Sequence, residues 1–139
     1  MKIAGIDYGR ARLGVAYSDD SQKIAFPKDA ILGKHDPEKN AHLCALELGK
    51  TSYELIVVGL PLLLTGKDSP MTQEVKTFAS FLEKLTGKQV VLWDERLTSK
   101  QIERELISKD VRRKERTKVV DSMAAALILQ SYLDTKNRS

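Results

Sequence analysis

Apolar residues follow two spacings along this chain, and those spacings predict the order of its elements. Short runs with strand character predict strands over 1–7, 13–18, 24–31, 55–59 and 89–93. Apolar positions at helical spacing, together with capping residues, predict helices over 36–50, 69–87, 98–108 and 117–134. Three strands followed by alternating helices and strands indicate an antiparallel meander extended by parallel crossover units. We therefore expect one α/β domain over residues 1–139, with a mixed sheet covered by helices.

Individual residues refine this order. Pro27 interrupts the third strand pattern and favours an edge position, since proline cannot donate to a sheet. Asp36 before Pro37 is typical of a helix N-cap followed by proline at the first helical position. The all-apolar run Leu55–Gly59 is typical of a strand buried on both faces, and Gly87 is expected to end the second helix.

Composition narrows the class of protein. The chain has 139 residues, of which 42% are hydrophobic and 30% charged, so it can build a core but has room for only one domain. Cys44 is the single cysteine and cannot form an intramolecular disulfide. Met1 leads directly into a strand pattern without a signal-peptide leader, and no apolar run approaches the length of a membrane span. We expect a cytoplasmic protein with no membrane role.

The positive charge is concentrated in one segment. The net charge is +4, yet residues 1–99 hold 13 basic and 13 acidic residues, whereas residues 100–118 hold eight basic and four acidic ones. Such a segment is either a solvated helix face or a contact for the phosphate backbone of a nucleic acid. We expect backbone contacts without base readout, with help from two arginines near Asp7. The candidate residues are Arg10, Arg12, Arg112, Arg113, Lys114 and Arg116.

Three carboxylates stand where a functional group is expected. Asp7 ends the first strand, Glu95 follows the last strand, and Asp121 lies near the start of the last predicted helix. Ligands of α/β sheets gather beyond the carboxyl ends of the strands. The small residues Ala124–Ala126 let the last helix approach the sheet, which brings Asp121 toward these ends. An acid near a helix N-terminus can also be purely structural, but together the three favour a shared site.

The residue types in this group favour a hard divalent cation. Carboxylates without cysteine or histidine partners select Mg²⁺ or Mn²⁺, and His35 and His42 show no ligand spacing. Carboxylate-held divalent ions suit phosphodiester hydrolysis by water. A basic segment beside such a site indicates a nuclease. The glycine-bearing hairpin after Asp7 also resembles the start of actin-like ATPases, but those enclose ATP between two domains and this chain has one.

Four ordered blocks resemble one known family. They are GIDYGRARLGVAYSD, VVGLPLLLTG, DERLTS and VDSMAAALILQSYL. They look like the YqgF family of Holliday-junction-resolvase-like proteins and pre-16S rRNA nucleases, within the ribonuclease-H-like superfamily. The resemblance spans nearly the whole chain. It implies a five-stranded mixed sheet of strand order 3-2-1-4-5, catalytic and metal-binding roles for Asp7, Glu95 and Asp121, and processing of small-subunit ribosomal RNA.

The resemblance leaves alternatives open. The substrate can be structured RNA, a ribosomal particle or branched DNA, and a relative that keeps the fold but only binds nucleic acid or a partner is a further hypothesis. The chain has Leu62–Thr65 where the family usually carries an asparagine or aspartate, so we do not transfer the family's substrate contacts to this loop. Because side chains alternate along a strand, we expect Glu95 to face the site and Asp94 to brace Arg96 or a loop.

Overall fold

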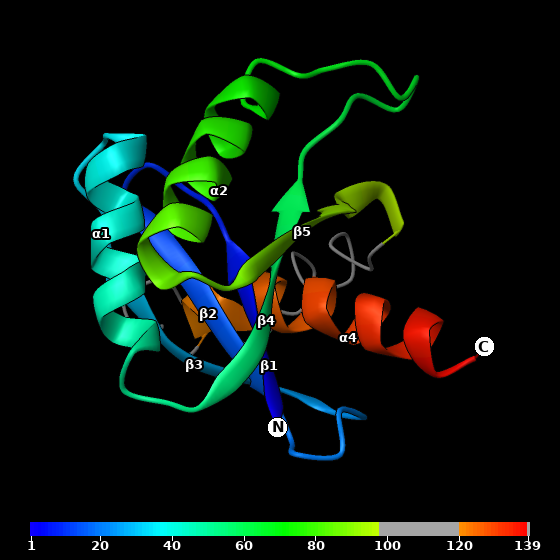
Figure 1. Ribbon diagram of the computed structural model, residues 1–139. Helices are drawn as coiled ribbons and strands as arrows, with labels where there is room; N and C mark the ends of the chain where they lie inside the picture. Colours follow the sequence, from blue (N-terminus) through cyan, green and yellow to red (C-terminus); the bar gives the residue numbers. More distant parts are fainter. Residues whose placement is uncertain (98–119, 139) are drawn as a thin grey trace.

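The computed structural model describes residues 1–97 and 120–138 of the chain (Figure 1). Three strands come first in the chain, and two further strands alternate with helices after them, as the apolar spacing predicts. The elements are β1 (Lys2–Asp7), β2 (Arg12–Ser18), β3 (Ala25–Leu32), α1 (Pro37–Leu48), β4 (Tyr53–Leu60), α2 (Thr72–Thr86), β5 (Gln89–Asp94), the 3-10 turns η1 (Glu95–Leu97) and η3 (Val120–Ser122), and α4 (Met123–Asn137).

The sheet has five strands in the order β3-β2-β1-β4-β5, which confirms the expected topology. β2 pairs antiparallel with β1 and with β3, whereas β4 pairs parallel with β1 and with β5. The strand that carries Pro27 is at the edge, as predicted. Because β1, β4 and β5 run in one direction, their carboxyl ends meet at one edge of the sheet, and β2 starts at that same edge.

Helices cover both faces of this sheet. α1 and α2 pack on one face and α4 packs on the other (Figure 1). Ile56 and Val58 of β4 belong to the core under α1 and α2, while Val57 belongs to the core under α4. All three have no exposed surface, so the prediction of a strand buried on both faces is confirmed. None of the helices in the described ranges combines the length and apolar character that crossing a membrane requires.

Capping residues lie at the start of α1 and at the end of α2, where the sequence predicts them. Asp36 is the N-cap of α1, and its carboxylate accepts hydrogen bonds from the backbone N–H groups of Glu38 and Lys39. Gly87 ends α2 with a φ of 70°, a left-handed conformation that favours glycine. These caps satisfy backbone groups that a helix end leaves without intrahelical partners.

Two helix starts differ from the prediction. α2 begins at Thr72 rather than at Ser69, because the Thr72 hydroxyl donates to the Pro61 carbonyl and accepts from the Ser69 N–H, which holds the residues before it in a turn. The last α-helix begins at Met123, and Asp121 lies in the 3-10 turn before it. The predicted helix over 98–108 and the residues 117–119 lie outside the described ranges.

Candidate active site

Asp7 lies at the carboxyl end of the central strand, on the face that α4 covers. Side chains alternate along β1: Ile3 packs in the core under α4, and a Cβ on Gly5 would lie 2.8 Å from Leu129 Cβ of that helix. Asp7 continues this alternation, whereas Tyr8 packs in the core under α1 and α2. The Asp7 side chain is half-buried at the end of the strand.

Asp121 reaches the same face through a close contact between η3 and β2. Gly14 pairs with Asp7 in the sheet, and a Cβ on Gly14 would lie 3.1 Å from the Asp121 carbonyl oxygen. The Ser122 hydroxyl accepts a hydrogen bond of 3.0 Å from the Val15 N–H, which attaches the turn to β2. The absence of a side chain at Gly14 therefore places Asp121 above the strand that neighbours Asp7.

Glu95 lies on the opposite side of Asp7, above β4. A Cβ on Gly59 would come within 2.7 Å of Glu95 Oε1 and 2.6 Å of Ile128 Cδ1. Gly59 directly follows Val58, whose partner on β1 is Ile6, so Gly59 is level with Asp7. The three carboxylates expected to share a site thus lie at one edge and on one face of the sheet.

Arg12 supplies a positive charge at this edge. Its Nη1 lies 2.7 Å from Asp121 Oδ2, and the two side chains come from opposite ends of the chain. The Arg12 side chain is 60% exposed and that of Asp121 only 11%, so the carboxylate is held in the protein surface while the guanidinium reaches into solvent.

The donor chemistry of the three acids suits Mg²⁺ or Mn²⁺, which prefer carboxylate oxygens. The carboxylate of Asp121 already accommodates a cation, the guanidinium of Arg12. Yet among residues 1–97 and 120–138 no three histidine, cysteine or acidic side chains are arranged together as metal ligands, and Asp7, Glu95 and Asp121 each have interaction partners. The three residues therefore fit a divalent ion in type and lie at one edge and on one face of the sheet, but the described side chains are not grouped as metal ligands and would have to draw closer to hold an ion.

Asp94 braces Arg96, which confirms the prediction for this neighbour of Glu95. Arg96 binds the Asp94 carboxylate through Nε and Nη2, at 3.1 and 2.7 Å, and its backbone N–H donates to Asp94 at 2.9 Å. The guanidinium lowers the pKa of the Asp94 carboxyl. Arg96 Nη1 also donates to the Leu64 carbonyl at 3.2 Å. The two residues that flank Glu95 are thereby fixed to each other and to the loop after β4.

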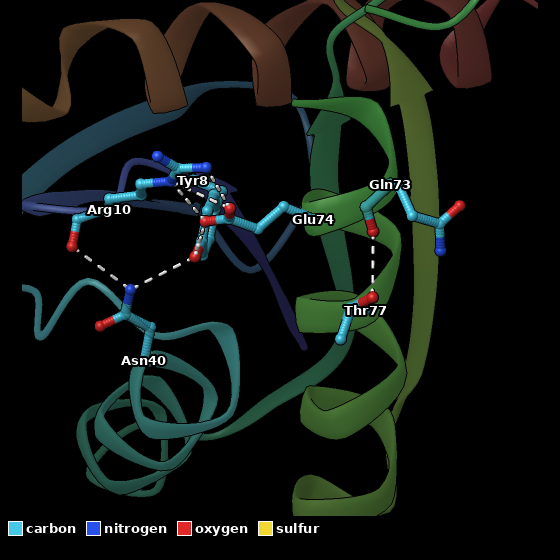
Figure 2. A network of polar contacts seen from close by, with 6 residues as sticks. All are labelled: Tyr8, Arg10, Asn40, Gln73, Glu74 and Thr77. Carbon is cyan, nitrogen blue, oxygen red and sulfur yellow. Dashed lines mark hydrogen bonds and ion pairs between the residues drawn. The ribbon is translucent and has the colours of Figure 1, made fainter. Parts of the chain in front are cut away.

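Arg10 belongs to a different cluster, on the other face of the sheet. Figure 2 shows its guanidinium on the carboxylate of Glu74 from α2, and Tyr8 and Asn40 complete the cluster. Arg10 Nη2 lies 2.8 Å from Glu74 Oε1, and the Tyr8 hydroxyl donates to Glu74 at 2.6 Å. Asn40 donates to the Arg10 carbonyl, so the cluster anchors the turn between β1 and β2. The sequence offers no signal for Glu74, because nothing local connects α2 with this turn.

The Tyr8 cluster predicts an alkaline loss of stability. Burial, helped by the hydrogen bond to Glu74, raises the pKa of Tyr8 from 10.0 to about 12. A raised pKa in the folded state adds stability that is present below the unfolded pKa and is lost as the pH rises from about 10 through about 12. Urea unfolding of wild type and Tyr8→Phe across this range should show a steeper decline in the wild type. Equal slopes would contradict the assignment.

The remaining basic candidates, Arg112, Arg113, Lys114 and Arg116, lie outside the described residues. Arg10 and Arg12, which the sequence places together, face opposite sides of the sheet: Arg10 contacts α2 and Arg12 contacts η3. Of these two arginines, only Arg12 contacts one of the three predicted site acids.

A five-stranded mixed sheet of this order, with helices on both faces and Asp7 at the carboxyl end of its central strand, has the ribonuclease-H-like fold. Two solved structures share the fold: RuvC of Thermus thermophilus (TM-score 0.59, 16% identity, 98% of this chain and 97% of that one) and the fowlpox virus Holliday junction resolvase (TM-score 0.57, 12% identity, 97% and 99%). The chain belongs to the RuvX family, described as Holliday junction resolvase, which matches residues 1–135.

Curated relatives carry another name. A protein of Protochlamydia amoebophila called "Putative pre-16S rRNA nuclease" is 42% identical over 143 residues, covering 97% of this chain and 94% of the relative. Proteins of the same name from Halothermothrix orenii and Listeria monocytogenes are 39% and 41% identical over 138 residues, with 99% of this chain covered and 98% and 100% of the relatives. Family membership agrees with the resemblance carried by the four sequence blocks.

Proposed function

We propose that this chain is a metal-dependent nuclease that hydrolyses phosphodiester bonds in the precursor of 16S ribosomal RNA, in the cytoplasm. The observation that carries the proposal is the position of Asp7 between Glu95 and Asp121 on one face of the sheet, with contacts through Gly14 and Gly59. The choice of substrate rests on the names of the relatives of about 40% identity, which are called pre-16S rRNA nucleases.

In this proposal Asp7, Glu95 and Asp121 hold Mg²⁺ or Mn²⁺. When bound, such ions activate water and stabilise the departing oxygen in phosphodiester hydrolysis. The chain itself contributes the positions of the ligands: Gly59 leaves space for the Glu95 carboxylate, and the bond from Val15 to Ser122 holds the turn that carries Asp121. The brace between Asp94 and Arg96 orients the backbone on both sides of Glu95.

We assign substrate binding to positively charged side chains, of which Arg12 lies at this edge and those of the segment 112–116 are taken from the sequence alone. Arg12 extends into solvent beside Asp121, and the basic residues of the segment 112–116 add backbone contacts that depend on charge and not on base sequence. Arg10 is held by Glu74 on the other face and is not part of the proposed contact surface. Structured RNA within a ribosomal particle presents the phosphate density that such a surface binds.

A second candidate substrate is branched DNA, because the matching family is described as Holliday junction resolvase. The deciding experiment compares a transcript spanning a 16S precursor end with a four-way DNA junction, each incubated with the protein and Mg²⁺ or Mn²⁺, and with EDTA as the control. We expect metal-dependent cleavage of the transcript. Cleavage of the junction alone would show that the substrate is branched DNA. Binding of the transcript or the junction without cleavage would indicate a non-catalytic relative.

Asp94 and Glu95 should respond differently to substitution. Glu95→Ala removes a proposed ligand and should lower cleavage by about a hundredfold or more, because metal ligation contributes several kcal/mol to catalysis. Asp94→Ala removes only the partner of Arg96 and should cost much less, with part of the loss recovered at higher metal concentration. Cleavage rates measured across a Mn²⁺ titration separate the two. If Asp94→Ala is the inactive variant, the assignment of Glu95 is wrong.

A further inference from the structure

The ion pair between Arg12 and Asp121 differs from the ion pair that Arg10, two residues earlier, makes with Glu74. Arg12 contacts Asp121 through Nη1 alone, whereas Arg10 contacts both oxygens of Glu74 through Nε and also through Nη2. Glu74 is additionally bound by Tyr8, so the Arg10 pair belongs to a network. Arg12 is therefore held to its carboxylate by fewer contacts than Arg10.

The two members of the pair also differ in how they are held. Asp121 is 11% exposed and lies in a turn that Ser122 attaches to β2, so its position is set by the fold. Arg12 is 60% exposed and begins β2 at the edge of the sheet. A long, solvated side chain loses little when it changes partner, because an exposed ion pair contributes little free energy. Arg12 is the member of the pair that can leave.

We propose that Arg12 exchanges partners: it neutralises Asp121 in the free protein and moves to a substrate phosphate when Asp121 takes up a divalent cation. This inference rests on the proposed nuclease function and assigns a positioning role to Arg12 within it. Three carboxylates converging on one edge repel each other, and a guanidinium on one of them offsets that repulsion. The same guanidinium competes with a metal ion for the carboxylate, and its planar group suits a phosphate.

The exchange predicts opposite effects on two binding reactions. Arg12→Gln should bind Mn²⁺ about threefold to tenfold more tightly than the wild type, because a competing cation is gone. In saturating Mn²⁺, measured before cleavage is detectable, the same variant should bind a short labelled RNA hairpin more weakly than the wild type, with a salt slope smaller by about 0.7 to 0.9 through the loss of one phosphate contact. In EDTA the two proteins should bind the hairpin alike. Arg12→Lys keeps the charge and should bind Mn²⁺ like the wild type. A purely structural role would not strengthen metal binding.

Arg10→Gln is the matched control, since it also removes an exposed arginine from an ion pair, two residues before Arg12. Its Mn²⁺ affinity, measured by isothermal titration calorimetry, should equal that of the wild type. Asp121→Asn should lose the Mn²⁺ affinity and the difference between the Arg12 variants. Circular dichroism confirms that each variant is folded.

The outcomes separate this inference from the proposed function. If the wild type binds Mn²⁺ and Arg12→Gln gains no affinity, the exchange is overturned and the nuclease proposal stands. If Arg12→Gln gains Mn²⁺ affinity and loses RNA affinity in Mn²⁺, but neither protein cleaves RNA or branched DNA, the exchange stands and the nuclease proposal fails. If RNA affinity in Mn²⁺ is unchanged, the transfer of Arg12 to a phosphate is overturned. If no variant binds Mn²⁺, both are overturned.

Discussion

Replacing Asp7 with asparagine should abolish cleavage while leaving the protein folded. Asp7 is flanked by Glu95 over β4 and by Asp121 over β2. Because it lies between them, Asp7 can share a bound metal ion with either of the other two carboxylates. Removing its charge weakens metal binding and should lower the cleavage rate by about a hundredfold to a thousandfold, which corresponds to several kcal/mol of lost stabilisation of the transition state. The rate is measured on the precursor transcript at saturating RNA.

The stability readout distinguishes this loss from unfolding. Asp7 stands in an acidic group, so its neutralisation should leave the melting temperature unchanged or raise it. Asp20→Asn is the matched control: Asp20 is exposed beyond the end of β2, at the opposite edge of the sheet, and should keep full activity. Equal cleavage by wild type and Asp7→Asn would remove Asp7 from the site, and a large fall in melting temperature would assign it a structural role instead.

Substituting Gly59 should damage both stability and activity. An alanine Cβ at this position would lie 2.6 Å from Ile128 Cδ1, 2.7 Å from Glu95 Oε1 and 3.0 Å from Glu95 Cγ. Both side chains would have to move, and overpacking of this kind costs about 1–3 kcal/mol. Because the displaced group is the proposed ligand Glu95, we expect cleavage to fall together with the free energy of unfolding in urea.

Three further variants isolate the cause of that loss. Gly49→Ala is the control, because Gly49 has a φ of −62° and its nearest contact would be an ordinary 3.4 Å, so it should be stabilised by about 0.4–1 kcal/mol. Adding Ile128→Val to Gly59→Ala should recover stability but not cleavage. In a Glu95→Ala background, Gly59→Ala should cost little further activity. Additive losses of activity would show that Gly59 does not act through Glu95.

The local sequence determined the elements and the identities of the candidate ligands. Strand and helix periods, the cap at Asp36, the left-handed Gly87 and the edge position of the strand with Pro27 all depend on interactions within a few residues. Alternation along β5 also predicted that the side chains of Asp94 and Glu95 point in different directions. The contact of Asp94 with Arg96 agrees with this prediction. These features follow from short-range geometry, which any stretch of sequence displays directly.

Tertiary structure decided where the functional side chains go. Asp121 lies in a turn and not in the helix, because Ser122 bonds to Val15 from 107 residues away. Arg10 and Arg12 are two positions apart yet have partners on opposite faces, since Glu74 and Asp121 arrive from α2 and η3. Glu95 lies next to Asp7 only because glycine at position 59 leaves room above β4. A short stretch of sequence is compatible with several side-chain directions, and contacts with segments far away in the chain decide which one is adopted. Those contacts cannot be read from the local sequence.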